Sequence, residues 1–273
     1  MTAPPAVFFL LVLILSVPFY LLGAGGERLL GLPILPTSAL MTFVPMTAAL
    51  ILSYRGHGTE GVVALLGRAL DFRRFNGARW YLTALLFVPV VYVLEFSVLQ
   101  WTGAEPPLPQ IALDQAMFFF VAFFIGAIGE ELGWQGYAYP ALRKRRSALS
   151  AALVVGVIWA LWHVIPFVQL GRNPAWIFWH SLSAIVLRII IVWLCANTRG
   201  SVLVAVLFHT MVNVSFALFS NAGSYYDPFV TFMILAFATG LIIVVWGPET
   251  LARFRWQVGS DSKDRSEEAM PHG

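Results

Sequence analysis

One short stretch of the sequence carries two adjacent carboxylates, Glu130 and Glu131, in strongly apolar surroundings. Neighbouring side chains on a helix point about 100° apart, so one carboxylate can face a site while the other makes supporting bonds. Small residues recur beside the pair and leave a smooth face for another helix or a substrate backbone; they are Gly126, Gly129, Gly133 and Gly136. The pair is a candidate catalytic group, although two carboxylates at a helix end can also lie in interfacial water.

Two further pairs of polar residues have the spacing of one helical turn. Trp159 lies four residues before His163, and His209 lies four residues before Asn213. The members of each pair therefore share a helix face. Each pair also has a purely structural explanation, because a buried histidine can bond a carbonyl group and because His and Asn side chains often bridge helices in membranes.

Together these residues favour activation of a water molecule over covalent catalysis. A glutamate in a dry site can act as a general base, and a histidine and an asparagine can donate to a developing oxyanion. The single cysteine, Cys195, has no histidine beside it, and the G-x-S-x-G pattern of serine hydrolases is absent. The H-E-x-x-H pattern of zinc proteases is absent too, which weakens a zinc site without excluding one.

The composition indicates which elements must position these groups. Of the 273 residues, 59% are hydrophobic and 11% are charged, and the mean hydropathy is +0.78. Soluble domains carry about 25% charged residues, so the composition excludes an ordinary soluble enzyme and predicts an all-α, polytopic membrane bundle. The isoelectric point of about 9.2 fits basic cytoplasmic loops, and no nucleic-acid partner is predicted.

Eight stretches are long and apolar enough to span a bilayer, which takes about 20 residues. We expect them at 6–22, 35–54, 80–101, 110–134, 147–169, 175–196, 200–220 and 227–246. Residues 1–250 then form one membrane-embedded helical domain, and residues 251–273 form a charged cytoplasmic tail.

The basic residues predict the orientation of the bundle. Fourteen Lys and Arg residues fall in the tails and in the loops of one side, whereas only Arg28 and Arg172 fall on the other side. Arg188 lies inside the sixth span. Because basic residues collect in cytoplasmic loops, we expect a protein of the cell membrane with both termini in the cytoplasm.

In their order along the chain, the three polar groups resemble the CPBP family, which comprises CAAX proteases and bacteriocin-processing or self-immunity proteins and is also called the Abi family. The matching segments are 130–137, 159–166 and 197–213. Each motif alone is weak, but the three in order on separate predicted spans make a specific pattern. The resemblance covers about residues 110–220.

The resemblance implies an intramembrane endopeptidase of eight helices, with a site inside the bilayer that opens to the cytoplasm. Its substrate is a protein or peptide, lipidated or not. The resemblance implies that Glu130 and His163 activate water. It implies that His209 and Asn213 form the oxyanion site. The supporting residues that it implies are Glu131, Gln135 and Trp159. No cofactor is expected, and the alternative is a zinc ion held by Glu130, His163 and His209.

The sequence departs from the family pattern at Gln135, where the family usually has arginine. That arginine is expected to pair with the second glutamate. Glu131 therefore needs another partner, such as Arg143 or a different basic residue, or else it is protonated.

With the expected spans, His163 and Glu130 would lie at different depths in the membrane. If its helix began at Ser147, His163 would lie about 24 Å from the cytoplasmic end, whereas Glu130 is expected near that end of its own helix. We therefore expect the fifth span to begin later, near Ala152, after an interfacial elbow over residues 139–149.

Two other functions remain open. A catalytically weak or inactive relative would act as a membrane binding or immunity partner. A small-solute transporter would need a polar path, for which the available residues are Glu95, Asp114, His180 and Arg188. The sequence shows no inverted repeat that would favour transport.

Overall fold

The computed structural model describes residues 4–71, 77–109, 111–220 and 225–252. Within these ranges the chain is helical and has no β-strand, only an isolated bridge between Arg28 and Pro36. Seven helical stretches are long and apolar enough to cross a membrane, and an eighth apolar helix, Val202–Leu218, is shorter. The prediction of an all-α, polytopic bundle is confirmed. The predicted tail lies outside the described residues from 253 onward.

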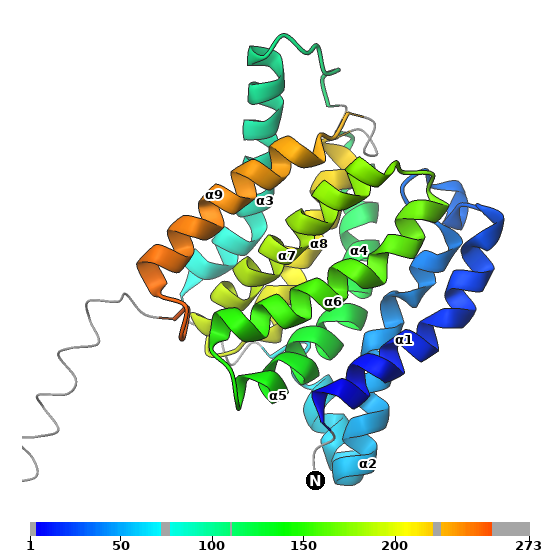
Figure 1. Ribbon diagram of the computed structural model, residues 1–273, viewed down its shortest axis with the longest axis vertical. Coiled ribbons are helices and arrows are strands. Elements are labelled where there is room, and N and C mark those ends of the chain that lie inside the picture. The colour runs from blue at the N-terminus through cyan, green and yellow to red at the C-terminus, as the bar shows by residue number, and fades with distance from the viewer. Residues whose placement is uncertain (1–3, 72–76, 110, 221–224, 253–273) are drawn as a thin grey trace, which may run out of the picture.

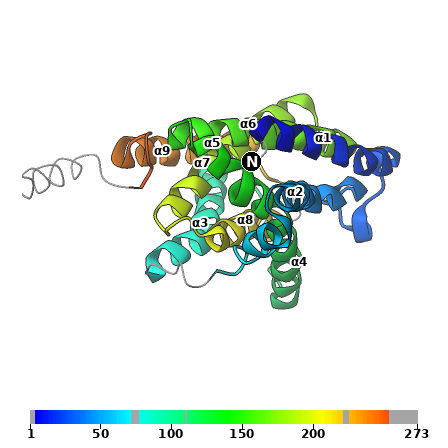
Figure 2. The same cartoon turned by 90° about the horizontal axis from the view of Figure 1, so that it is seen from below.

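The eight long helices form two layers of four, as Figures 1 and 2 show. One layer contains, in spatial order, α1 (Pro5–Leu22), α6 (Ala148–Gln169), α7 (Pro174–Ala196) and α9 (Pro228–Trp246). The other contains α2 (Val44–Leu66), α4 (Leu113–Gly133), α8 (Val202–Leu218) and α3 (Ala78–Trp101). The layers meet where α1 packs on α2, α7 on α8 and α3 on α9.

Short elements connect and extend these helices. Between α1 and α2 the chain forms three 3-10 turns, η1 (Gly23–Gly25), η2 (Leu29–Gly31) and η3 (Thr37–Phe43), and η3 runs directly into α2. After α4 the chain stays helical through a π-helical turn, η5 (Trp134–Ala138), and the short α5 (Tyr139–Arg143). The order of the eight expected spans agrees with these helices. The second helix continues to Leu66, with non-helical backbone at His57 and Gly58.

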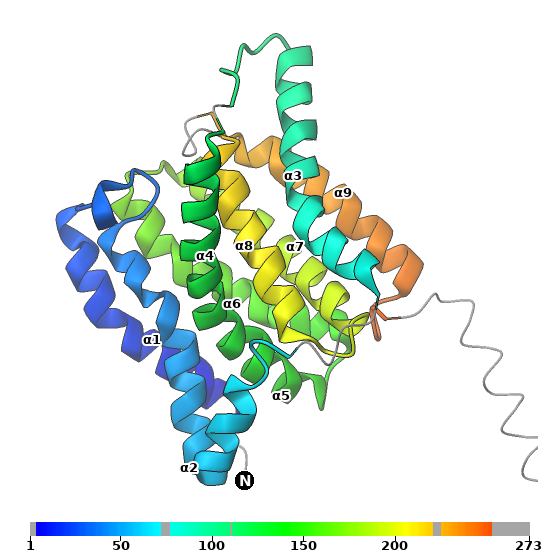
Figure 3. The ribbon, with the colours of Figure 1, turned by 180° about the vertical axis from the view of Figure 1, so that it is seen from behind.

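Helix α8 is the most enclosed of the eight, because it packs between α3 and α4 and against α7. Most of its side chains are buried, including those of Phe208, His209 and Thr210. Figure 3 shows α8 between α4 and α3, with α7 behind it. This position brings His209 to the centre of the bundle.

Glycines on α4 allow η3 and α2 to come very close. A Cβ atom at Gly129 would lie 2.8 Å from the carbonyl oxygen of Thr42, and one at Gly133 would lie 2.5 Å from the backbone of Pro45. The glycine face predicted from the sequence is therefore occupied by another helical segment. This close approach carries Thr42 to the Glu130 carboxylate.

The expected late start of the fifth span is wrong. Helix α6 begins at Ala148, where the hydroxyl of Ser147 caps it by accepting from the amide of Ser150 at 3.1 Å. The expected position of Glu130 near the end of its helix is also wrong. Because the helix continues through η5 and α5, Glu130 lies thirteen residues, or about 20 Å, before its end at Arg143. It therefore lies deep in the bundle without any shift of α6.

Candidate active site

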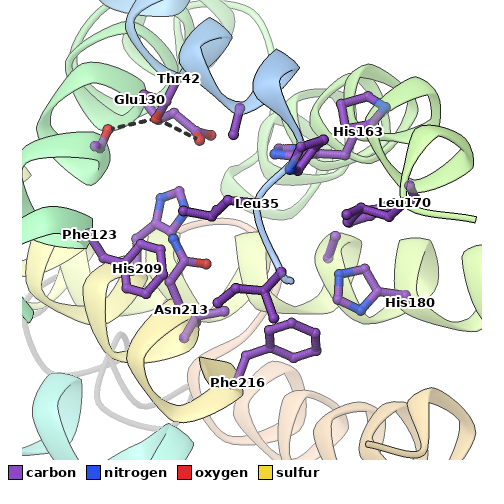
Figure 4. Close-up of a pocket in the computed structure, with 18 of the residues that line it drawn as sticks. Leu35, Thr42, Phe123, Glu130, His163, Leu170, His180, His209, Asn213 and Phe216 are labelled. Carbon is purple, nitrogen blue, oxygen red and sulfur yellow. Dashed lines mark hydrogen bonds between the residues drawn. The ribbon is translucent and has the colours of Figure 1, made fainter. Parts of the chain in front are cut away.

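A cavity of about 330 Å³ lies between the two helical layers. Glu130 and His209 reach it from the layer of α4 and α8, and His163 reaches it from α6 in the other layer. Asn213, one turn after His209 on α8, lines it as well. Figure 4 shows these four residues around one space, together with apolar side chains such as Phe123 and Leu35. The structure thus brings together the four candidate residues from three segments of the sequence.

Three donors hold the Glu130 carboxylate. Its Oε2 accepts from the indole Nε1 of Trp159 at 2.7 Å and from that of Trp134 at 3.3 Å. Its Oε1 accepts from the Thr42 hydroxyl at 3.3 Å. The carboxylate is almost fully enclosed, with 6% of the residue exposed, yet it lines the cavity. These contacts fix its orientation at the cavity wall.

One nitrogen of His163 is committed to the backbone. Its Nδ1 lies 2.9 Å from the carbonyl oxygen of Trp159, one turn earlier on α6. A carbonyl oxygen only accepts, so Nδ1 must donate and the neutral ring keeps its lone pair on Nε2. The sequence alone left open that His163 is a structural residue whose ring only bonds a carbonyl group. The structure has the bond and also places the ring at the cavity.

The second carboxylate lies behind His209 and is completely buried. Glu131 Oε1 lies 2.9 Å from Nδ1 of His209. Both carboxylate oxygens also accept from Arg188, with Oε2 2.6 Å from Nη1 and Oε1 3.0 Å from Nη2. Such two-point contact orients both partners. Glu131 therefore faces away from the cavity and holds the His209 ring from behind.

Trp159 links the two carboxylate systems. Its indole N–H donates to Glu130, while the guanidinium carbon of Arg188 lies 4.5 Å from its ring centre. Its ring also meets those of His163 and His209 edge-on, with centroids 5.4 and 5.3 Å apart. A cation over an indole face is a favourable contact, most of all where water is excluded. Trp159 thus contacts Glu130, Arg188 and the rings of both His163 and His209.

Arg188, rather than Arg143, replaces the arginine missing from the family pattern. Arg143 donates to the carbonyl of Arg146. Gln135 lines a second cavity of about 430 Å³ near Arg143, and its buried Oε1 has no hydrogen-bond partner among the described residues. Gln135 therefore does not support the site through Glu131.

Three contributors to the site were not predicted from the sequence: Thr42, Trp134 and Arg188. Trp134 lies four residues after Glu130, so helical spacing could have identified it. Arg188 is a basic residue inside a span, which marks it as a group that needs a buried partner. Nothing in the sequence signals Thr42, because its contact depends on how η3 packs against α4.

The residues considered for a transport path have separate structural partners. Glu95 accepts from the amide of Asp227 at 2.7 Å and from the hydroxyl of Thr231 at 2.8 Å, where α9 begins. His180 bonds the hydroxyl of Tyr226 at 3.0 Å. Asp114 is exposed in the first turn of α4. Of the four candidates, only His180 lines the cavity.

The cavity extends to one end of the bundle. Its lining includes Leu29 and Leu30 before α2, Leu170 and Arg172 between α6 and α7, and Tyr226 before α9. These loops lie at the end opposite the N-terminus and α5, as Figure 1 shows. They are also the loops with few basic residues. The basic-residue count assigns this end to the outer side of the membrane, whereas the family resemblance implies a site that opens to the cytoplasm, so the two predictions disagree.

The alternative to a metal-free site is a zinc ion held by Glu130, His163 and His209. In the part of the chain that the structure describes, no three His, Cys, Asp or Glu side chains are grouped so that they could hold a metal ion. Both imidazoles use Nδ1 for other contacts, which leaves Nε2 as the nitrogen available in each.

Comparison with known proteins agrees with this arrangement. Residues 112–215 match the family model described as Type II CAAX prenyl endopeptidase Rce1-like. Over 100 residues the chain is 35% identical to CAAX prenyl protease 2 of Methanococcus maripaludis, an alignment that covers 33% of this chain and 36% of that protein. The chain thus matches about a third of that relative's length. The resemblance to the CPBP family is therefore confirmed over residues 112–215, and the chain is a multi-pass membrane protein.

Proposed function

We propose that this chain is an intramembrane endopeptidase of the CAAX type, which hydrolyses a peptide bond of a protein or peptide inside the cavity between the two layers. One observation carries the proposal: Glu130, His163, His209 and Asn213 line the same, mostly apolar cavity. Leaving such groups in an apolar environment is costly, and they tend to mark function. The family match over residues 112–215, which holds all four, supports the reaction class.

In this proposal Glu130 and His163 activate water. The water donates one hydrogen bond to Glu130 and one to the free Nε2 of His163. As the water oxygen attacks the carbonyl carbon, its proton passes to the Glu130 carboxylate. The proton then passes to the leaving nitrogen when the C–N bond breaks. No covalent enzyme intermediate and no cofactor is required.

His209 and Asn213 would stabilise the oxyanion that forms on the substrate carbonyl. They lie one turn apart on α8, so both can reach one oxygen atom. Asn213 donates from its amide. His209 would donate from Nε2 while its Nδ1 donates to the Glu131 carboxylate, so this role requires a ring that carries both protons. Glu131 and Arg188 are positioning residues, since they act through the ring of His209.

The cavity lining suggests a substrate that carries an apolar group. Aliphatic and aromatic side chains form most of the wall, among them Leu35, Phe119, Phe123 and Phe216. A prenyl chain attached to a cysteine near the cleaved bond would bury against them. The matching family is described as a prenyl endopeptidase and the relative as a prenyl protease, which supports a prenylated substrate.

The test is cleavage of an S-farnesylated fluorogenic peptide ending in C-a-a-X by the purified protein in detergent. Glu130→Gln keeps the shape of the side chain and removes the proton acceptor, so it should lower the rate by about 10²–10⁴. Glu95→Gln is the matched control, because Glu95 is a buried carboxylate that bonds α9 and does not line the cavity. Equal rates for Glu130→Gln and wild type would overturn the proposal and favour a binding or immunity partner.

A further inference from the structure

The second cavity is a basic pocket at the end of the bundle that carries α5 and the N-terminus, which Figure 1 shows. Its volume is about 430 Å³, and it lies between the turn after α2, the segment from η5 to the end of α5, and the turn between α7 and α8. Three cations line it: Arg68, Arg143 and Lys144. None of the described residues that line it is acidic. The pocket therefore favours a negatively charged ligand.

Two of these cations, Arg143 and Lys144, form no ion pair within the described part of the chain. Arg143 donates to the carbonyl of Arg146, which orients the guanidinium without neutralising its charge. Lys144 is exposed at the pocket wall. Arg68 donates to the carbonyl of Gly136 and so ties the turn after α2 to the π-helical turn. The pocket thus has a fixed shape and a positive charge.

A buried amide of the same pocket lacks a donor for its oxygen. Gln135 is 4% exposed, and no described residue donates to its Oε1. An unpaired buried carbonyl oxygen costs free energy, so a ligand that donates a hydrogen bond there is favoured. An ionised phosphodiester or carboxylate only accepts, and a cationic amine is repelled by the neighbouring cations. The complementary ligand therefore joins a negative charge to a hydroxyl group.

The surroundings of the pocket favour a lipid as the source of this chemistry. Leu66 and Leu70, two residues before and after Arg68, are exposed. Such leucines at the end of a membrane bundle offer an apolar surface to acyl chains. The basic residues also predict that this end faces the cytoplasm, the side on which basic pockets between helices bind the headgroups of anionic lipids.

We propose that the second cavity binds the headgroup of an anionic glycerophospholipid, with its phosphodiester against Arg143 and Lys144 and a headgroup hydroxyl donating to Gln135. Phosphatidylglycerol has this chemistry. The proposal does not depend on the endopeptidase function, because the two cavities share no lining residue. A soluble phosphate ester that carries a hydroxyl has the same groups, and the test below separates the two sources.

The first arm compares two lipids that differ only in the headgroup hydroxyls. The full-length protein in detergent is titrated with phosphatidylglycerol and with phosphatidylethanol of the same acyl chains, and bound lipid is counted by native mass spectrometry. Each lipid carries one ionised phosphodiester, so the hydrogen bond to Gln135 should make phosphatidylglycerol bind about 2- to 10-fold tighter. Gln135→Met should bring the two affinities together. Equal affinities for the wild type would overturn the proposal, however Gln135→Met folds.

The second arm tests the charges with a matched pair of double variants. Arg143→Gln/Lys144→Gln should weaken the binding of both lipids about 25-fold, since each basic residue contributes about fivefold. Arg145→Gln/Arg146→Gln removes two exposed charges from the same turn but outside the pocket lining, and it should bind as wild type does. An equal loss in the two double variants would show only a general attraction of anionic lipid to this end and would overturn the pocket.

The third arm separates the two sources of the headgroup. Glycerophosphoglycerol, which is the phosphatidylglycerol headgroup without acyl chains, should not displace the bound lipid at an equal concentration. Displacement would assign the pocket to a soluble phosphate ester and overturn the lipid proposal.

Discussion

Arg188 on α7 and Glu131 on α4 form a two-point ion pair in which both side chains are 0% exposed. The pair joins the two helical layers directly behind the cavity that Glu130 and His209 line. It also supplies, from a distant helix, the charge that the family motif carries at the position of Gln135. The cation beside the second glutamate thus comes from a position 53 residues after Gln135.

This relationship predicts a loss and a rescue of stability. Arg188→Met leaves the Glu131 charge buried with only His209 beside it, and removing one partner of a buried pair typically costs about 3–5 kcal/mol. Gln135→Arg, one turn after Glu131, restores a cation in the family position. We expect the melting temperature in detergent to fall with Arg188→Met and to recover partly in Arg188→Met/Gln135→Arg. A double variant no more stable than Arg188→Met would contradict the account of the pair.

The indole N–H of Trp159 is predicted to support catalysis. Trp159→Phe keeps an aromatic ring beside Arg188 and removes the 2.7 Å bond to Glu130. A bond to a charged group is worth about 1.5–3 kcal/mol, so the cleavage rate should fall about 10- to 100-fold. Trp162→Phe is the control, because its N–H bonds Ser16 on α1 at 2.7 Å. Equal rates for the two variants would remove Trp159 from the active site.

The orientation of the bundle can be measured by labelling from one side of the membrane. Leu30, at the cavity end, is 79% exposed, and Arg145 is exposed in the basic turn after α5. The basic-residue count predicts that an impermeant maleimide labels Leu30→Cys in intact cells and Arg145→Cys only after permeabilisation. The native Cys195 is buried and should stay unlabelled in both. The reverse pattern would place the cavity opening and its substrate in the cytoplasm.

The sequence predicted the helices well because long apolar stretches are a strong local signal. It also identified His163, His209 and Asn213 as cavity residues, since polar side chains stand out in such stretches. The sequence predicted Glu130 too near the membrane surface. Nothing in the sequence around Gly136 predicts that the helix continues through a π-helical turn to Arg143. The end of the bundle toward which the cavity extends could not be predicted, because helix periodicity shows only which residues share a face.

The ion pair between Glu131 and Arg188 could not be predicted from the sequence for a different reason. Arg188 was visible in the sequence as a basic residue within a span, but nothing local connects α7 with α4. The pairing depends on the tertiary packing of the two layers. Within one of these layers, Gly156 on α6 allows the backbone of Ile185 and the Cβ of Arg188 on α7 to approach. The same is true of Thr42, which reaches Glu130 only because η3 packs against the glycines of α4.

The central claim, that Glu130 rather than a metal ion activates water, is tested most directly by the rate of peptide cleavage after metal removal. The wild-type protein is treated with a strong chelator, its zinc content is measured by mass spectrometry, and cleavage of the farnesylated peptide is followed beside Glu130→Gln. We predict an unchanged rate for the metal-depleted wild type and a loss of about 10²–10⁴ for Glu130→Gln. Activity lost on depletion and restored by zinc would contradict the account and make Glu130, His163 and His209 metal ligands instead.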